Sequence, residues 1–248
     1  MIQIKTPEEL ELMRDPCKMT GDVLKLIGEK IKAGMTTKEL DEIAFRYIKS
    51  MGAEPSFLGY CGYPASICAS VDDMIIHGIP SDDVVIQDGQ IVSIDVGVYY
   101  NGFHGDAART FMVGNVSPEK RKLVAVTKEC FFRAIDVLNE GTPLGDIGDA
   151  IQSYAEENGF SVVREYVGHG IGRDMHEDPA VPNFGKRGTG IRLQQGMVVA
   201  VEPMINMGTQ KIKLLSDGWG VKTLDGMPSA HYENTVAITE EGVEIMTL

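Results

Sequence analysis

The chain has 248 residues and a formal net charge of −13, and 43% of its residues are hydrophobic and 24% charged. This composition is typical of a soluble globular protein, and the acidic balance argues against nucleic acid or a membrane surface as the main partner. The first residues show no signal-peptide pattern, and no apolar run approaches the roughly 20 residues of a membrane-spanning helix. Because the four cysteines suggest no disulfide framework, we expect a cytoplasmic protein.

Two helices followed by strands are predicted for the first part of the chain. Thr6-Pro-Glu-Glu9 is a capping box with proline at the first helical position, and apolar residues recur at helical spacing as far as Ile31. A second capping box, Thr36-Thr-Lys-Glu39, predicts a shorter helix that ends at Gly52. Strands and hairpins follow up to about Gly114.

The same order of elements is predicted a second time. Ser117-Pro118 opens another long helix that Gly141 closes, and a shorter helix ends at Gly159. No linker rich in proline or serine separates the two parts. We therefore expect one domain made of two related halves, about 1–114 and about 115–248.

Residues repeat at one offset along the chain, the 107 positions that separate Gly34 from Gly141. The other matching pairs at this offset are Leu40 and Ile147, Tyr47 and Tyr154, Gly52 and Gly159, Gly89 and Gly196, and Asp95 and Glu202. Chance is a poor explanation when glycines that end helices and acids that end apolar strands all share one offset. We therefore interpret the chain as a duplication.

Each half also carries a second acid within a His-x-acid motif. The two motifs are His104-Gly-Asp106 and His231-Tyr-Glu233. Asp106 follows Asp95 by 11 positions, whereas Glu233 follows Glu202 by 31. The second half therefore contains 20 additional residues between its two acids.

A hairpin is expected to bring the two acids of the first half together. Asn101-Gly102 is a strong signal for a two-residue β-hairpin turn. In the register set by this turn, Gly97 lies opposite Asp106, and Asp95 lies diagonal to Asp106 on the same face, about 8 Å away at the backbone. A single acid would more often cap a turn or pair with Arg109. Because the arrangement is duplicated, we interpret it as part of a site.

Four carboxylates meet if the halves pack about a pseudo-two-fold axis: Asp95, Asp106, Glu202 and Glu233. Four anions in an apolar site cannot all stay ionised without cations, and Arg109 alone is not enough. We therefore predict two divalent metal ions about 3.5–4 Å apart. Oxygen ligands with one imidazole suit Mn, Fe, Co or Zn, and two such ions would hold a water between them for attack on a carbonyl.

Histidines gather around the same segments. The glycine-rich loop Gly168–Pro179 holds His169 and His176, and His77 begins a similar turn in the first half. A lone buried histidine is more often a hydrogen-bonded core residue than a ligand. All five histidines of this chain nevertheless lie in or beside the acidic segments, which favours a site.

Several uncommon motifs in a fixed order resemble the type I methionine aminopeptidases, which have the pita-bread fold. The motifs are Tyr60-Cys-Gly-Tyr-Pro64, His77-Gly-Ile-Pro80, Ile94-Asp-Val96, Gly102-Phe-His-Gly-Asp106, Gly168-His-Gly-Ile-Gly172, Met175-His-Glu-Asp-Pro179, Glu202-Pro203 and Tyr232-Glu-Asn-Thr235. The resemblance implies an α+β fold in which two pseudo-symmetric helix-helix-strand halves surround a curved antiparallel sheet. It also implies a single catalytic domain over residues 1–248.

The resemblance assigns roles to the site residues. The implied metal ligands are Asp95, Asp106, His169, Glu202 and Glu233. Asp106 and Glu233 would bridge the ions, and Glu202 would also act as general base for the attacking water. His176 would stabilise the oxyanion and His77 would contact the scissile amide. The residues implied for the methionine pocket are Phe57, Tyr60, Tyr63, Cys68, Met175 and Trp219.

Three positions depart from the family pattern without removing a metal ligand. Position 57 is often small in the family but is Phe57 here, position 175 is usually phenylalanine but is Met175, and Asn234 replaces a common histidine. These departures leave the shape of the pocket open.

We expect a monomeric enzyme that removes the initiator methionine from nascent polypeptides, near the ribosome, when the second residue is small. One alternative is a pita-bread prolidase or proline aminopeptidase, although such enzymes usually carry a separate N-terminal domain. A different class is a catalytically inactive binding protein on the same scaffold, which would be expected to have lost ligands.

Overall fold

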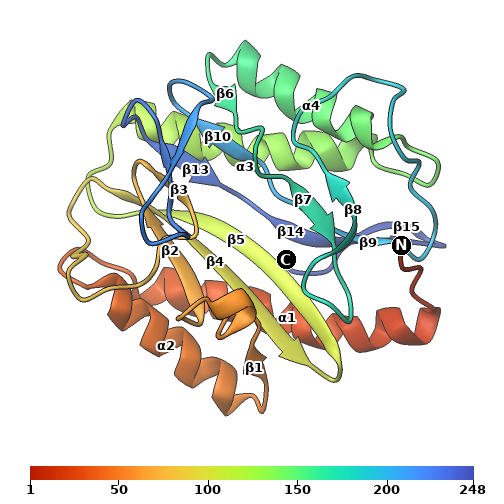
Figure 1. The fold of residues 1–248 in the computed structure, drawn as a ribbon, viewed down its shortest axis with the longest axis horizontal. Helices are drawn as coiled ribbons and strands as arrows, with labels where there is room; N and C mark the ends of the chain where they lie inside the picture. Colours follow the sequence, from red (N-terminus) through yellow and green to blue (C-terminus); the bar gives the residue numbers. More distant parts are fainter.

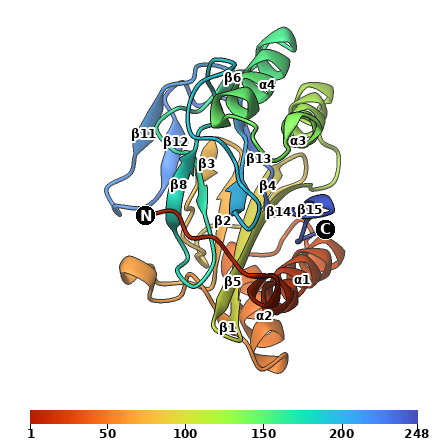
Figure 2. The ribbon, with the colours of Figure 1, turned by 90° about the vertical axis from the view of Figure 1, so that its right-hand side faces the viewer.

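Four helices form two pairs, one from each half of the chain. In the computed structural model, which describes residues 1–248, all four lie on one side of the strands (Figures 1 and 2). The helices are α1 (Pro7–Lys30), α2 (Thr37–Ser50), α3 (Pro118–Val137) and α4 (Leu144–Glu157). None of them combines the length and apolarity needed to cross a membrane.

Capping contacts confirm the predicted helix starts. Thr6 Oγ1 accepts a hydrogen bond from Glu9 N at 3.2 Å, and Thr36 Oγ1 accepts one from Glu39 N at 3.1 Å. Ser117 caps α3 in the same way, whereas α4 begins without a side-chain cap. Local sequence therefore sets the start of three of the four helices.

The duplication is visible in the backbone as well as in the order of elements. Gly34 and Gly141 have φ angles of 91° and 82°, and Gly89 and Gly196 have φ angles of 82° and 83°. Such left-handed conformations favour glycine because they crowd a Cβ atom. The repeated glycines therefore mark equivalent turns in the two halves.

The first half contains five strands, and four of them form an antiparallel sheet around one long strand. The strands are β1 (Glu54–Pro55), β2 (Ile67–Val71), β3 (Met74–Ile76), β4 (Ile91–Tyr100) and β5 (Phe103–Met112), of which β3 lies outside this sheet. Strand β4 pairs with β1, β2 and β5, and a short 3₁₀ helix, η1 (Tyr60–Gly62), lies between β1 and β2 in the chain.

The second half contributes ten shorter strands. They are β6 (Ser161–Val162), β7 (Gly168–Gly170), β8 (Glu177–Val181), β9 (Val198–Val201), β10 (Met204–Asn206), β11 (Ile212–Leu214), β12 (Val221–Thr223), β13 (Ser229–His231), β14 (Asn234–Thr239) and β15 (Gly242–Ile245). Five of them form a sheet in the order β15-β14-β9-β7-β8. The additional residues between Glu202 and Glu233 include β11 and β12, and β12 pairs with β3 of the first half.

The predicted hairpin register is confirmed. Asn101 and Gly102 both have positive φ angles, 52° and 84°, as a tight two-residue turn requires. Gly97 pairs with Asp106 across the β4–β5 ladder, which leaves Asp95 diagonal to Asp106 on the same face.

Separate hydrophobic cores hold the helices of each half against the strands. Ile27 and Ile94 belong to the core under α1 and α2, and Phe131 and Val199 belong to the core under α3 and α4; all four are fully buried. Burying one such side chain contributes roughly 1.5–3 kcal/mol. Each core holds one half together. The strands that carry or adjoin the four acids, β4, β5, β9 and β14, lie between the two helix pairs (Figure 1).

Candidate metal centre

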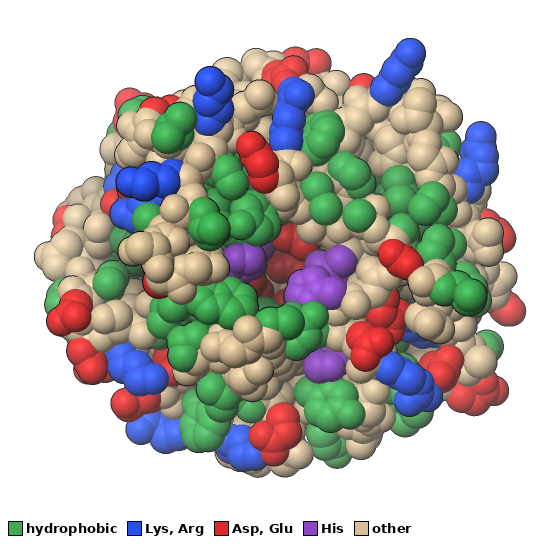
Figure 3. All heavy atoms as spheres, viewed as in Figure 1, with side chains coloured by type: hydrophobic (Ala, Val, Ile, Leu, Met, Phe, Trp, Pro, Cys, Tyr) green, Lys and Arg blue, Asp and Glu red, His purple; other side chains and the backbone are tan.

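A cavity of about 130 Å³ opens near the middle of the face opposite the helices, with histidines around an acidic floor (Figure 3). Four carboxylates, three histidines and five aromatic or sulfur-containing side chains line it. They are Asp95, Asp106, Glu202, Glu233, His77, His169, His176, Phe57, Tyr60, Tyr63, Cys68 and Trp219. Of the site residues predicted from the sequence, only Met175 is absent from the lining.

The four carboxylates come from four different parts of the chain. Asp95 lies on β4, Asp106 on β5, Glu202 directly after β9, and Glu233 between β13 and β14. Asp106, Glu202 and Glu233 are buried. Each half therefore contributes two acids to one cavity, as the duplication predicted.

Burial and mutual repulsion make this cluster costly without a cation. Burial raises the pKa of Asp106 to about 7. Burial, with repulsion from the neighbouring acids, raises the pKa values of Asp95, Glu202 and Glu233 well above their usual range. Asp95 Oδ1, Asp106 Oδ1 and Glu233 Oε1 are buried without a hydrogen-bond partner. Unpaired buried carboxylate oxygens are the donors that a divalent ion needs.

The nearby arginine does not neutralise the acids. Arg109 donates to the backbone carbonyls of Ala108 and Glu233 and to Asn234 Oδ1, at 2.6 Å for the last contact. Asn234 Oδ1 also accepts from Thr247 Oγ1 at 3.0 Å. Asn234 therefore connects Arg109 to the end of the chain, and the sequence alternative in which one acid pairs with Arg109 does not describe this structure.

Two groups of side chains have the right donors for a metal ion. One contains Asp106, His169 and Glu233, and the other contains Asp95, His231 and Glu233. Within each group the donor atoms lie within 4.8 Å of one another. The cluster therefore fits divalent cations, with Glu233 common to both groups.

His169 presents one ring nitrogen to the acids. Its Nδ1 lies 2.8 Å from the carbonyl oxygen of Gly170, so this nitrogen carries the proton and donates it. Its Nε2 is then free and lies 3.7 Å from both Asp106 Oδ2 and Glu202 Oε1. Burial lowers the pKa of His169 to about 4, so the ring is neutral, as a metal ligand must be.

The other two cavity histidines face the opening. The Nδ1 of His176 lies 2.9 Å from the hydroxyl of Tyr60, and the two rings stack at 5.3 Å. The His77 ring meets Tyr166 and Trp219 edge to face, with ring centroids 5.6 and 6.4 Å apart. Both imidazoles are therefore held by aromatic neighbours beside the carboxylates.

An apolar pocket adjoins the carboxylates. The Trp219 ring meets Tyr63 edge to face at 5.0 Å, and the Tyr63 hydroxyl is fixed by the carbonyls of Ile67 and Gly78. Met175, which is 2% exposed, lies in the apolar cluster that includes Tyr63 and Phe57 but does not line the cavity. The structure thus places Met175 in support of the pocket wall, because its side chain packs inward.

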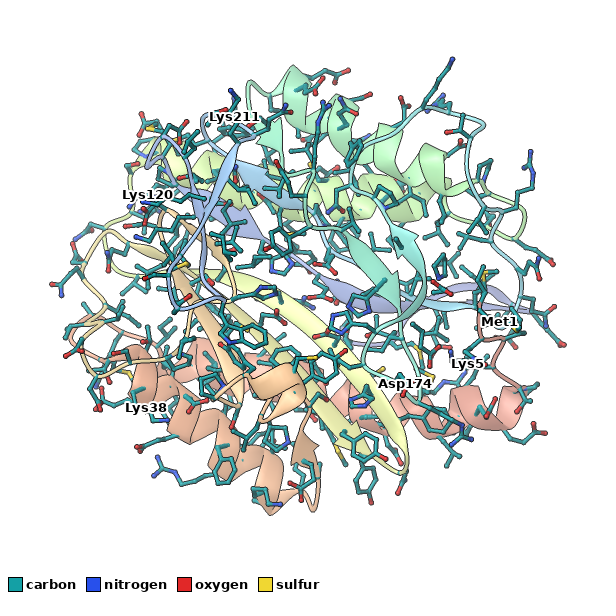
Figure 4. The ribbon with its side chains drawn as sticks, in the orientation of Figure 1. Met1, Lys5, Lys38, Lys120, Asp174 and Lys211 are labelled. Atoms are coloured by element: carbon teal, nitrogen blue, oxygen red, sulfur yellow. The ribbon has the colours of Figure 1, made fainter.

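A buried ion pair holds the loop that carries His176. Lys5 Nζ contacts Glu177 Oε2, and the two side chains are 4% and 5% exposed. Glu177 Oε1 also accepts from the backbone N of Asp174 at 3.3 Å. Figure 4 shows Lys5 beside the loop segment of Asp174. The N-terminal segment therefore fixes one edge of the cavity, a contact that sequence patterns did not reveal.

The two His-x-acid motifs place their histidines differently. His104 contacts Ser56 Oγ at 2.8 Å and packs on Tyr99, outside the cavity lining. His231 is 2% exposed and its Nε2 lies 3.7 Å from Glu202 Oε2. The His-x-acid motif drew attention to His231 in the sequence, but no role was predicted for this residue.

The sequence pattern of metallopeptidase family M24 matches residues 11–240. The chain belongs to this family. A methionine aminopeptidase from Clostridium perfringens is 55% identical to it over 248 residues, covering 100% of this chain and 99% of that protein. A methionine aminopeptidase crystal structure from Rickettsia prowazekii superposes with a TM-score of 0.98 at 43% identity, covering 100% of both chains.

Prolidases share the fold at greater distance. The prolidase from Pyrococcus furiosus superposes with a TM-score of 0.79 at 25% identity, covering 99% of this chain but 65% of that one. The expected α+β pita-bread fold with two pseudo-symmetric halves is confirmed. The comparisons favour the methionine aminopeptidases over the prolidase alternative.

Proposed function

We propose that the protein is a metal-dependent aminopeptidase that hydrolyses the bond after an N-terminal methionine. The observation that carries this proposal is a small aromatic pocket directly beside four converging carboxylates. Aromatic and sulfur-containing walls suit a thioether side chain. Relatives named methionine aminopeptidase, at 55% and 49% identity over the whole chain, support the same conclusion.

The residues proposed to hold two divalent ions are Asp95, Asp106, His169, Glu202 and Glu233, with Asp106 and Glu233 shared between the ions. The oxygen-rich donor set supports Mn, Fe, Co or Zn. Bound there, the ions would supply positive charge that activates water and polarises the scissile carbonyl.

The side chains around the cavity would perform the proton transfers. Glu202 would take a proton from the attacking water at its carboxylate and deliver it to the leaving amine. The Tyr60 hydroxyl would donate to Nδ1 of His176, which leaves a proton on Nε2 for a hydrogen bond to the developing oxyanion. His77 would contact the scissile amide from the other side of the opening.

The small cavity accounts for cleavage at one terminal residue. The cavity is small, about 130 Å³, and we propose that it takes only the first side chain while the rest of the substrate chain leaves through the opening. We propose that small second residues pass this opening best and that the substrates are the initiator methionines of nascent polypeptides.

Both halves contribute acids to one cavity, which supports one catalytic domain over residues 1–248 with the halves joined near residue 114. We propose that this domain acts as a monomer in the cytoplasm, near the ribosome where its substrates emerge. Sedimentation of the metal-loaded protein tests the oligomeric state, and fractionation of cells tests the location.

Peptide hydrolysis distinguishes the candidate activities. The cobalt-loaded protein should cleave Met-Ala-x peptides at least about tenfold faster than x-Pro peptides, because the pocket selects the first side chain. Faster cleavage of x-Pro peptides would support the prolidase alternative. Activity that survives both chelation and Glu202→Gln would show that this centre does not catalyse the reaction.

A further inference from the structure

A second imidazole faces the carboxylate cluster in addition to that of His169. His231, the last residue of β13, is 2% exposed. Its Nε2 is buried without any hydrogen-bond partner, 3.7 Å from Glu202 Oε2 and 3.8 Å from Glu233 Oε2. A buried, unpartnered nitrogen aimed at carboxylates requires a proton or a cation between them.

The backbone around His231 fixes the position of the ring. Its N donates to Thr110 Oγ1 at 2.9 Å, and Thr110 Oγ1 donates to its carbonyl oxygen at 2.8 Å. On the other side of the strand, His231 pairs with Met204 of β10. These contacts hold the backbone of His231 in place, and burial of the side chain, which is 2% exposed, limits the movement of the ring.

We propose that His231 supplies a nitrogen ligand to the ion held by Asp95 and Glu233. Each of the two ions would then have one imidazole, from His169 and His231 respectively, and the ligand set would have six residues. The proposal rests on the two-ion centre proposed above. Ligand atoms about 2.0–2.2 Å from one ion lie roughly 3–4 Å apart, which matches the 3.8 Å between His231 Nε2 and Glu233 Oε2. The donor atoms of Asp95, His231 and Glu233 all lie within 4.8 Å of one another.

An imidazole ligand on the ion held by Asp95 and Glu233 would change which metal ions the centre prefers. Carboxylates alone suit Mg and Mn, whereas added nitrogen favours Co and Zn. The second ion should therefore bind more tightly, relative to the first, than an all-carboxylate site would allow.

The decisive measurement is a crystal structure of the full-length protein loaded with Co²⁺. His231 Nε2 should lie about 2.1 Å from one of two cobalt ions. Two cobalt ions with His231 Nε2 beyond hydrogen-bond reach of either would overturn the ligand role and leave the proposed function intact. Failure of the cluster to bind cobalt at all would overturn both.

Calorimetric titration of the metal-free protein provides a second readout that does not depend on activity. His231→Gln should weaken one of two Co²⁺ sites by at least about 100-fold, beyond the roughly 10–100-fold effect typical of residues that only orient a ligand. His104→Gln is the matched control, because this histidine occupies the equivalent motif outside the cavity, and it should leave both sites unchanged. If His231→Gln retains both affinities, the residue does not coordinate the ion.

Discussion

Ala108 and Glu233 exchange two backbone hydrogen bonds: Glu233 N donates to Ala108 O at 3.0 Å and Ala108 N donates to Glu233 O at 3.4 Å. Ala108 lies on β5 of the first half, whereas Glu233 precedes β14 of the second half. Thr235 adds two bonds beside this pair, to the backbone N and O of Asp106, at 3.0 and 2.8 Å. The spacing between Asp106 and Glu233 is therefore set by hydrogen bonds between the two halves, from the main chain of Glu233 and the hydroxyl of Thr235.

Replacement of Glu202, which is proposed both as general base and as metal ligand, should lower catalysis even at saturating Co²⁺. We predict that Glu202→Gln lowers kcat by at least about 100-fold, because a positioned base contributes roughly 10²–10⁴-fold. Gln has the same shape, so the circular dichroism spectrum and the apolar pocket should be unchanged. Steady-state kinetics on Met-Ala-x peptides measures the effect, and a kcat within about threefold of the parent would assign the proton transfer elsewhere.

The carboxylate cluster should make the metal-free protein less stable as the pH rises above about 6.5. Burial raises the pKa of Asp106 to about 7, so this group binds more protons in the folded chain than in the unfolded one, and its contribution is lost as the pH rises through 7. The buried histidines act in the opposite sense: their lowered pKa values, about 4 for His169, let their contribution grow until about pH 7.5, about one unit above the unfolded value. We expect the four carboxylates with raised pKa values to outweigh them. Urea unfolding in the presence of a chelator at about pH 6.5 and about pH 8 should show a lower midpoint at the higher pH.

Two controls accompany that pH experiment. Asp106→Asn removes the group with the pKa near 7 and should reduce the decline. Added Co²⁺ should reverse the decline, because an ion that binds only the folded chain stabilises it. A urea midpoint that stays constant or rises with pH in the metal-free protein would contradict the burial of ionisable acids at this site.

The buried ion pair between the N-terminal segment and the active-site loop should be important for stability. We predict that Lys5→Met lowers the free energy of unfolding by about 3–5 kcal/mol, because it leaves Glu177 buried without its partner. The double variant Lys5→Met/Glu177→Gln should recover part of this loss, since no unpaired charge remains. Chemical denaturation of the metal-loaded variants measures both values, and equal losses in the single and double variants would argue against an electrostatic origin.

Trp219 should control the selection of the first residue. Trp219→Ala removes the ring that packs on Tyr63, and we predict a decrease in kcat/KM of roughly 10–200-fold for Met-Ala-x, mostly through KM. Phe45→Ala, at an exposed aromatic on α2, is the control and should have no effect. If Trp219→Ala leaves kcat/KM for methionine unchanged, this ring does not form the pocket wall.

Much of the scaffold follows from local sequence. The capping boxes at Thr6 and Thr36 fix helix starts because they satisfy free N–H groups within four residues. Asn101-Gly102 fixes the β4–β5 register, which in turn makes Asp95 diagonal to Asp106. The duplication then indicated that Glu202 and Glu233 would meet the first pair, and the structure brings all four together.

The direction of individual side chains was decided only by tertiary structure. His104 lies two residues before Asp106 along β5, about 7 Å nearer the hairpin turn, and packs on Tyr99 instead of reaching the cavity. His231 stands at the same place in its own motif, but β13 ends there and the chain turns its ring toward Glu202.

The same distinction applies to Met175 and Trp219, whose burial depends on segments far away in the chain. The sequence by itself determined the repeated elements, the paired acids and their register, because those depend on contacts between near neighbours. The tertiary structure decided which histidines reach the acids and which apolar side chains line the pocket, because those depend on how the two halves pack.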